Sequence, residues 1–335
     1  MKSRARRNLT KPLVVGSLIA FVLLLPVFVA GYWIHVITIA AIDVILVVSF
    51  RLITQMGGWS FAHVGLMSVG GYTSALLTTK YLHWSFWLTL PLGGLAAACV
   101  ALAISYPCLR TREFYFFLST FAAGEAIRQV WVNWRFFGAI FGIPFLARPT
   151  PILGLKFVSP MANYYLILFF CLLTVFILYW FDKSRISKTL LAINSHETLC
   201  SSMGINAWGY RALAFVVGSF FAGIAGVLFV HFIGYANPVM FTTLYSFKIV
   251  TAAIIGGVGT LAGPIIGLII LVIVTEIFRD MLLWFPIVQG LLIVLVLLFL
   301  PHGLESVPSQ LSPLVGRLQG KIRDKLKKNG AQGEG

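Results

Sequence analysis

The sequence predicts an all-α polytopic membrane protein with about ten transmembrane helices, arranged as two inverted five-helix halves. Of its 335 residues, 59% are hydrophobic and only 10% are charged, whereas a soluble domain has about 25% charged residues. Several apolar stretches reach the roughly 20 residues that cross a bilayer core, and one Gly-rich segment interrupts each half. These observations exclude an ordinary soluble fold.

Basic residues predict the orientation, because short loops rich in Lys and Arg stay in the cytoplasm. They cluster before the first apolar stretch, in mid-chain and in the tail: Lys2, Arg4, Arg6, Arg7, Lys11; Lys183, Arg185, Lys188; Arg317, Lys321, Arg323, Lys325, Lys327 and Lys328. Both termini are therefore expected inside, with an even number of spans. The net charge of +15 reflects this bias and an attraction to anionic membrane lipids, so no nucleic-acid partner is expected.

Three segments are expected along the chain. Residues 1–12 form a basic cytoplasmic N-terminus, residues 13–304 a transmembrane permease domain, and residues 305–335 a basic, disordered cytoplasmic tail. Within the domain, residues 182–209 are the longest polar interruption on the inner side. The expected spans are 13–30, 34–53, 59–79, 84–106, 113–133, 161–181, 210–233, 244–257, 260–278 and 284–300. The span 13–30 is expected to stay in the mature protein as a helix, because no convincing signal-peptide cleavage site follows it.

Two Gly-rich segments, Gly57–Tyr72 and Gly256–Gly267, interrupt otherwise apolar runs. Unwound backbone is tolerated in a membrane only where it lines a cavity or is buried in protein, and paired interruptions are typical of inverted-repeat transporters. An alternative is close helix packing through small residues, such as Gly259, Gly263 and Gly267. The two interpretations are compatible, and both stay open.

Ionisable residues inside apolar spans are candidates for function, because burying them in a membrane is costly. Glu125 and Arg128 are three residues apart, so one helix face can carry both as an ion pair near the outer end of their span, with a structural or a gating role. Asp43 needs a partner from another helix. His63 is expected to be neutral and hydrogen-bonded to backbone, or else to lie on the pathway.

No enzyme is expected from the motifs. The chain has no GxSxG, HExxH or paired-carboxylate motif. The nearest approach to a phosphate-binding loop, Gly316 to Ile322, has one residue too few between its glycines and lacks the Ser or Thr that would hold magnesium. The four cysteines lack CxxC spacing. We therefore expect no cofactor, no metal site and no ATPase on this chain.

The polar segment 182–209 contains one expected helix, Leu190–Ser202, lying along the membrane. Gly204 is placed to end it in the left-handed conformation. From the residues alone, this segment is a docking element for a cytoplasmic partner or a surface loop.

Five short blocks follow one another between residues 34 and 304. They are Gly57-x-x-Ser60-x-x-His63 with Gly70-x-Tyr72-Thr73; Leu109-Arg110-x-Arg112-x-x-Tyr115-Phe116 with Thr120, Ala122 and Glu125; Ala192-Ile193, Glu197 and Met203-Gly204-Ile205-Asn206, continuing through Ala214-Phe215 and Ala222-Gly223-x-Ala225-Gly226; Gly256-Gly257-x-Gly259-Thr260-x-x-Gly263-Pro264-x-x-Gly267; and Pro301-x-Gly303-Leu304. In this order they resemble the LivM-type permease subunits of the branched-chain amino acid ABC transporter family.

The chain departs from that pattern at three places. After Asn133-Trp134 the outer loop reads Phe137 to Gly142 and lacks the usual Thr and one Gly. Asn194 and Ser195 stand where an Arg and an acidic residue are common, and Glu113 replaces a Gly. These departures affect the assignment of substrate and partner more than that of the fold.

The resemblance implies a multi-pass permease subunit of an ATP-driven importer in the bacterial inner membrane. The implied substrate is a branched-chain or other small amino acid delivered by an extracytoplasmic binding protein. The implied partners are two ATP-binding subunits, which would hold the ATP, and a second permease, either LivH-type or another copy of this chain.

The resemblance also implies roles for particular residues. Glu197, Met203, Gly204 and Ile205 are expected to couple the permease to the ATPase subunits. The translocation-pathway candidates are Gly57, His63, Tyr72, Glu125, Gly256, Gly257 and Gly259.

Two alternatives to an amino acid importer remain. A permease of the same superfamily for urea, amides or sugars would look similar, since specificity resides largely in the binding protein. An ion-coupled secondary transporter would instead use Asp43 and Glu125 as coupling sites and would need no ATPase.

Overall fold

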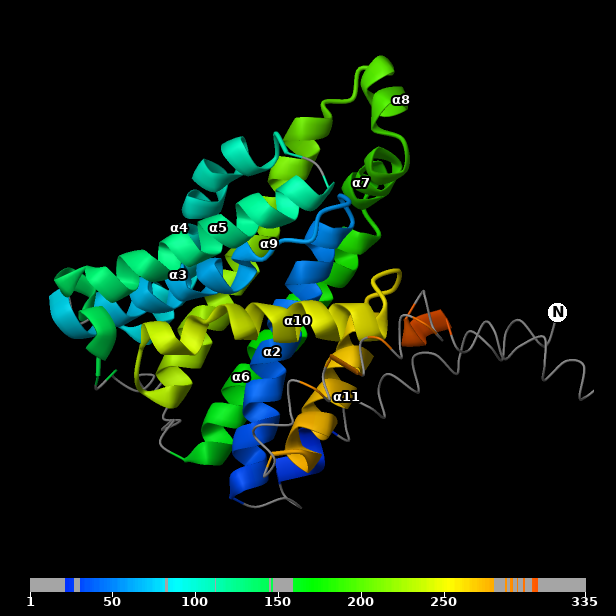
Figure 1. The fold of residues 1–335 in the computed structure, drawn as a ribbon. Coiled ribbons are helices and arrows are strands. Elements are labelled where there is room, and N and C mark those ends of the chain that lie inside the picture. Colours follow the sequence, from blue (N-terminus) through cyan, green and yellow to red (C-terminus); the bar gives the residue numbers. More distant parts are fainter. Residues whose placement is uncertain are drawn as a thin grey trace, which may run out of the picture. The chain divides into compact units, whose positions relative to one another are not determined.

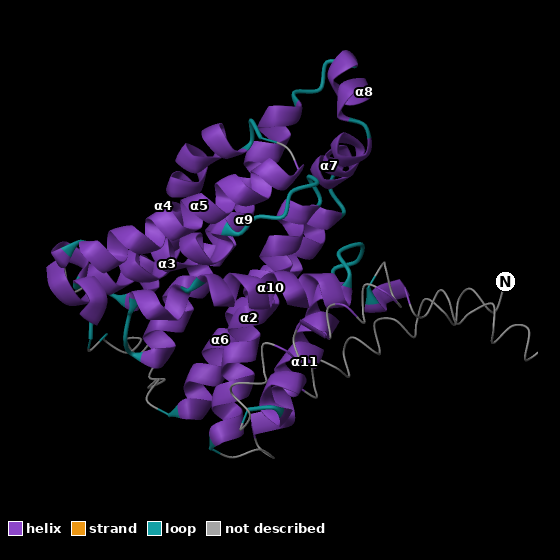
Figure 2. Ribbon diagram, in the orientation of Figure 1, coloured by secondary structure: helices purple, strands orange, loops and turns teal. Residues whose placement is uncertain are grey.

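The computed structural model describes residues 22–26, 31–81, 84–111, 113–144, 146, 159–279 and 303–306, together with residues 287, 290, 291, 294 and 298. Within these residues every regular element is helical (Figures 1 and 2). An isolated bridge joins Ile143 and Ala236. The chain forms two compact bodies, residues 1–246 and 247–335. The predicted all-α fold is confirmed.

The helices follow the predicted spans closely. They are α2 (Tyr32–Thr54), α3 (Ala62–Leu76), α4 (Phe86–Cys108), α5 (Glu113–Asn133), α6 (Pro160–Asp182), α7 (Arg185–Ser195), α8 (Glu197–Ser202), α9 (Ala207–Ile233), α10 (Thr243–Gly256) and α11 (Ala262–Ile277), with short turns η1 (Leu77–Tyr81), η2 (Arg135–Phe137), η3 (Ala139–Phe141), η4 (Pro238–Phe241) and η5 (Leu304–Ser306). The predicted spans 13–30 and 284–300 lie largely outside the described residues.

Among the described residues, five helical segments are long and apolar enough to cross a membrane. These segments are Tyr32–Thr54, Phe86–Cys108, Pro160–Asp182, Ala207–Ile233 and Pro238–Gly256. α11 is apolar but shorter. α5 has sufficient length but is not among the five, and it carries the Glu125 and Arg128 charges.

Local sequence explains where several helices begin and end. The Ser159 hydroxyl accepts a bond from the Ala162 amide at the start of α6, and Asn206 does the same for Gly209 at the start of α9, which satisfies amides that have no partner inside the helix. α9 ends at Gly234, whose φ of 79° is left-handed, a conformation that costs glycine little.

α9 is the central helix of the first body and packs against α2, α3 and α4 (Figure 1). Glycines allow these helices to approach closely. A Cβ added at Gly70 would overlap the backbone of Gly223, and one at Gly226 would overlap the Met67 carbonyl. The later glycines of the first Gly-rich segment therefore lie inside α3 and serve close packing, as the small-residue interpretation predicted.

The backbone unwinds only in the first part of each Gly-rich segment. The first break runs from Gln55 to Phe61 and contains Gly57 with a φ of 86°; the second runs from Gly257 to Leu261, and Gly257 has a φ of 87°. Each segment thus combines an unwound stretch with a stretch of helix packing.

A third break, residues 234–242, separates α9 from α10. The breaks at Gly57 and Gly256, predicted as a pair, do not occupy equivalent places in two five-span halves. The first lies between the second and third predicted spans and the other between the eighth and ninth. By span order, the break before α3 corresponds instead to the break before α10.

The second body is built around the Gly256–Gly267 segment. A Cβ at Gly256 would overlap the Gly263 carbonyl, and one at Gly267 would overlap the Ala252 carbonyl, so α10 and α11 approach backbone to backbone. Gly303 lies in the same way against Gly257. The turn η5 extends to Ser306, two residues past the predicted end of the permease domain at residue 304.

Candidate functional site

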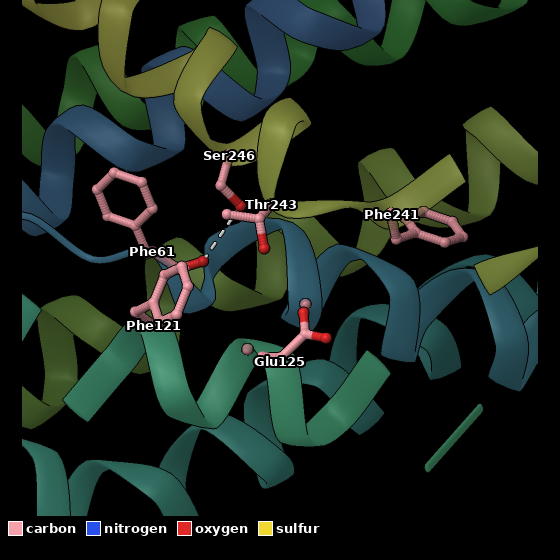
Figure 3. Close-up of a pocket in the computed structure, with 8 residues that line it drawn as sticks. Phe61, Phe121, Glu125, Phe241, Thr243 and Ser246 are labelled. Carbon is pink, nitrogen blue, oxygen red and sulfur yellow. Dashed lines mark hydrogen bonds between the residues drawn. The ribbon is translucent and has the colours of Figure 1, made fainter. Parts of the chain in front are cut away.

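An opening in the first body lies where the start of α3, the middle of α5 and the start of α10 meet (Figure 3). The space inside it is about 10 Å³, which is room for about one water molecule. The residues that line it are Phe61, Gly65, Phe121, Gly124, Glu125, Phe241, Thr243 and Ser246. Three phenyl rings, two hydroxyls and a carboxylate therefore surround one small space.

Glu125 is the charged member of this lining. The Arg128 Nε donates to its Oε1 and Oε2 at 3.0 and 2.9 Å, the Arg128 Nη2 also donates to Oε1, and Gln129 Nε2 donates to Oε1 at 3.0 Å. The predicted ion pair is confirmed. Glu125 lies 12 residues after Glu113 and 8 before Asn133, so the pair belongs to the second half of α5, and its position near the outer end of the span stays a prediction.

The starts of α3 and α10 are joined at the opening. The Ser246 hydroxyl donates to the Phe61 carbonyl at 3.2 Å, and the Phe61 amide donates to Thr120 Oγ1 of α5 at 3.2 Å. Helix N-termini carry partial positive charge. The opening is consequently bordered by two such termini on one side and by the Glu125 carboxylate on the other.

Tyr72 of α3 lies in an aromatic cluster with residues of α5, η2 and η4. Its ring is fully buried and stacks on Trp131 at 4.5 Å between centroids, with Phe137 and Phe241 in tilted or edge contact. Within the described residues its hydroxyl has no hydrogen-bond partner. Phe241 also lines the opening, so the cluster connects the opening to the altered outer loop.

Two further buried polar residues, Asp43 and His63, have specific partners. Asp43 is fully buried and accepts a bond of 2.5 Å from the Tyr245 hydroxyl, which supplies the predicted partner from another helix. His63 is buried with Nε2 at 2.9 Å from Ser49 Oγ, and its ring meets that of Phe50 edge-on. His63 therefore contributes to the packing of α3 on α2 and is not among the residues that line the opening.

The 182–209 segment folds as two helices, α7 and α8, and not as the single helix predicted over Leu190–Ser202. The chain turns at His196, whose φ of −149° is not helical. The predicted end is confirmed, since α8 stops at Ser202 and Gly204 has a φ of 83°.

The coupling candidates gather at one end of this segment. Glu197 pairs with Arg211 of α9 at 3.0 Å, and Ile205 packs on a small cluster of Ile193, Cys200 and Ala207. Met203 is 75% exposed. Glu197 and Ile205 thus fix the segment to α9, while Met203 presents an apolar side chain at its surface.

A buried polar cluster that sequence reasoning missed joins this segment to α2. Asp182 accepts from Arg51 Nη1 at 3.0 Å and from Gln55 Nε2 at 2.6 Å, and the Ser187 hydroxyl donates to Gln55 Oε1 at 3.0 Å. Arg51 is only 5% exposed. An Arg at the end of an apolar span and an Asp at the end of another were the available signals, but nothing in the sequence paired them.

Gly57, a predicted pathway residue, lies beside this cluster. A Cβ added to it would come within 2.5 Å of Asn194 Oδ1 in α7. The first break therefore contacts the predicted coupling segment directly, at a position where the chain departs from the family pattern.

In the second body, Gly259 lies beside the carboxylate of Glu305, which sequence reasoning also missed, whereas Gly256 packs on the Gly263 backbone and Gly257 on Gly303. Glu305 accepts from the Gly259 amide at 2.8 Å and from the Thr260 amide and hydroxyl at 2.7 Å each. Glu305 belongs to the tail that is predicted to be disordered. It instead holds the loop of the second break.

The described residues contain no group of three or more His, Cys, Asp or Glu side chains that could hold a metal ion.

Comparison with known proteins identifies relatives across most of the chain. Residues 32–301 match the family described as "Branched-chain amino acid transport system / permease component". The high-affinity branched-chain amino acid transport system permease protein LivM of Escherichia coli K12 is 27% identical over 304 residues, covering 83% of this chain and 71% of LivM.

Two further relatives carry similar names. The permease protein LivH of Salmonella typhimurium LT2 is 25% identical over 293 residues, covering 81% of this chain and 94% of LivH. The permease protein BraD of Pseudomonas aeruginosa is 32% identical over 140 residues, covering 41% of this chain and 43% of BraD. No solved structure was found to match.

Proposed function

We propose that this chain, which belongs to the branched-chain amino acid transport system permease family, is the transmembrane permease subunit of an ATP-driven importer. The proposed substrates are branched-chain or other small amino acids. The observation that carries this proposal is the meeting of two helix starts and a carboxylate at one opening. Half-helix N-termini that converge inside a membrane are typical of transporter substrate pathways.

Ten spans in two inverted halves explain why those two helices meet. By span order α3 and α10 are each the third span of their half, and the bond between Ser246 and Phe61 joins their starts. An inverted repeat relates equivalent elements by an axis in the membrane plane. Equivalent helices that begin inside the membrane would then meet near that axis.

The 182–209 segment is proposed as the contact for two ATP-binding subunits. Leu191, Leu199, Met203 and Trp208 are exposed on it, and exposed apolar patches mark interaction sites. Asp182, Gln55 and Ser187 connect the segment to the end of α2 and the first break. Movement of α7 on ATP binding would therefore reach Gly57 without an intermediate element.

The remaining assignments follow from the charge pattern and the family. Both termini and the 182–209 segment lie in the cytoplasm of a bacterial inner membrane, and ATP is held by the partner subunits. The complex includes a LivH-type permease or a second copy of this chain, and an extracytoplasmic binding protein. The exposed Ile140 and Phe141 of the outer loop are placed to contact that binding protein.

Purification of the tagged chain from its native host in mild detergent, followed by uptake assays in proteoliposomes, tests the proposal. We expect ATP-binding subunits and a second permease to co-purify, and labelled leucine to enter only with ATP and binding protein. Uptake driven by an ion gradient without ATPase subunits would contradict it, and Asp43 and Glu125 would then be the coupling sites to test.

Variants in the segment test the coupling. Met203→Arg places a charge on the exposed apolar surface, so ATP hydrolysis should lose its stimulation by loaded binding protein while the complex still assembles. Asn133→Ala, in the outward-facing end of α5, is the control. Unchanged stimulation of ATP hydrolysis in the Met203→Arg variant would contradict the proposal that the 182–209 segment contacts the ATP-binding subunits.

A further inference from the structure

The exposed face of α5 differs in chemistry from the exposed faces of α4 and α6. The faces of α4 and α6 are apolar and present large side chains: Leu88, Leu95 and Leu102 on α4, and Phe169, Phe176 and Trp180 on α6. Lipid tails are as apolar as such side chains, so lipid covers these two faces without cost. The exposed face of α5 carries small and polar side chains instead.

This α5 face consists of Leu118, Ala122, Ala126 and Gln129. The four residues follow one another at intervals of four, four and three, which places them on one side of a helix. All four are exposed. Within the described part of the chain, α5 packs on α3 through its opposite side, where Gly124 is buried. The α5 face is therefore left open by the first body.

A hydrogen-bonded polar group lies on and beside the α5 face. The Gln129 Nε2 donates to Glu125 Oε1 at 3.0 Å, and Glu125, which is 31% exposed, flanks the face. Glu125 stands eight residues before the end of α5, about 12 Å along the helix axis. Charged residues of membrane helices rarely face lipid, because hydrocarbon offers them no hydrogen bonds. The α5 face consequently requires protein as its neighbour.

The small residues of the α5 face suit contact with another helix. Small residues four positions apart let two membrane helices approach closely, and Ala122 and Ala126 have this spacing. The first body already uses this kind of contact on the other side of α5, where a Cβ added at Gly65 would lie 2.9 Å from the Gly124 Cα. The same packing chemistry is thus repeated on a side of α5 that stays exposed in the described residues.

The proposed function leaves one membrane-embedded neighbour for this face. The ATP-binding subunits and the binding protein lie outside the membrane, so the neighbour is the second permease. Two similar chains pair most often around a twofold axis, which brings the same surface of each chain together. Arg128 neutralises Glu125 within α5, so two copies of the face meet without net repulsion.

We propose that the α5 face is the contact surface for the second permease, and that its occupant is the corresponding face of that chain. Ala122 and Ala126 form the close contact between the two helices, and Gln129 lies beside it. The inference rests on the proposed function and deepens it, because it names the surface through which the two permeases associate.

Disulfide cross-linking in the complete transporter tests the contact. Of the four cysteines Cys99 is exposed and the other three are buried, so Cys99→Ser provides the background. Ala126→Cys is combined with a cysteine at the aligned position of the second permease and oxidised with copper–phenanthroline in native membranes. A disulfide needs Cβ atoms about 3.5–4.5 Å apart. We expect a disulfide-linked pair of permeases, with the joined peptides identified by mass spectrometry.

Two further cysteine positions complete the cross-linking test. Ala103→Cys, on the exposed face of α4, is the matched control and should give no linked pair. Ala122→Cys, one helical turn from Ala126, should give one. The inference is overturned if neither α5 position forms a disulfide while both react with a maleimide that dissolves in lipid, since lipid then covers the face. A disulfide to any other subunit overturns it as well.

A bulky substitution tests the same contact without cross-linking. Ala126→Trp fills the space between the two helices, so the second permease recovered with the tagged chain should fall about tenfold, while the yield of the tagged chain is unchanged. Ala103→Trp on α4 is the control and should recover as much second permease as wild type. Equal recovery in the two variants would contradict the proposal. If Ala126→Trp lowers the yield of the tagged chain itself, the cysteine variants decide.

Failure of the inference and failure of the proposed function have different signatures. A disulfide between the two α5 faces in a complex that imports no amino acid with ATP would support the contact and refute the proposed import. ATP-driven import by a complex in which neither α5 position cross-links would support the proposed function and overturn the contact.

Discussion

The two breaks that contain Gly57 and Gly257 have the same local design and different supports. Each has a glycine in the left-handed region, with φ of 86° at Gly57 and 87° at Gly257. The first break leads to α3, of 15 residues, and the second to α11, of 16 residues, and both helices lack a side-chain N-cap. Left-handed backbone is easily adopted by glycine and costly for other residues. Local sequence therefore sets the break in both places.

The supports differ in their distance along the chain. The first break adjoins a polar cluster that brings Asp182 and Ser187 to Gln55, residues about 130 positions apart, and its Gly57 faces Asn194. The second is held by Glu305, 45 or 46 positions away. The first break is therefore attached to the proposed ATPase-coupling segment, whereas the second is stabilised by its own body.

The largest effect is expected at Asp182. Asp182→Ala leaves the buried Arg51 guanidinium without this carboxylate, and breaking a buried pair costs about 2 to 4 kcal/mol where one partner is partly exposed, as Asp182 is at 27%. The thermal midpoint and yield of the assembled complex should both fall, with loss of coupled ATP hydrolysis. Lys183→Ala, one residue further, should change little. Equal thermal midpoints and equal coupled ATP hydrolysis in the two variants would show that the cluster contributes neither to stability nor to coupling.

A smaller effect is expected at Glu305. Glu305→Ala removes an acceptor of three hydrogen bonds to Gly259 and Thr260, at a cost of about 1 to 3 kcal/mol. The thermal midpoint should fall, while the ATP hydrolysed per leucine imported by the remaining complex stays unchanged. Glu305→Gln keeps one acceptor oxygen, so its thermal midpoint should fall less than that of Glu305→Ala. A changed coupling ratio would contradict the contrast between the two breaks.

The smallest effect is expected at Gly57. Gly57→Ala must hold a φ of 86°, which costs a non-glycine residue about 1 to 2 kcal/mol, and its Cβ approaches Asn194 Oδ1. The double variant Gly57→Ala/Asn194→Ala removes that contact but not the backbone strain. We expect it to recover ATPase coupling without recovering the full thermal midpoint. Recovery of neither property would mean that Gly57 does not act through α7.

Much of the fold was predictable because membrane helices are set by local composition. Each predicted span between residues 34 and 278 contains an observed helix, and Gly204 ends α8 as expected. The Glu125–Arg128 pair was also predictable, since three residues on a helix place two side chains on one face. The turn at His196 was not, because its two short helices look continuous in sequence.

Local sequence accounts for where the described chain is helical, where it unwinds and which mid-chain segment is polar. The contact of Phe61 with Ser246, 185 positions later, and that of Arg51 with Asp182 depend on how the helices pack together. The physical reason is that helix faces toward lipid and toward other helices are both apolar, so hydrophobicity does not reveal which faces pack together. Small residues and buried polar pairs fix which faces pack together, and these pairs are recognised only in the assembled helices.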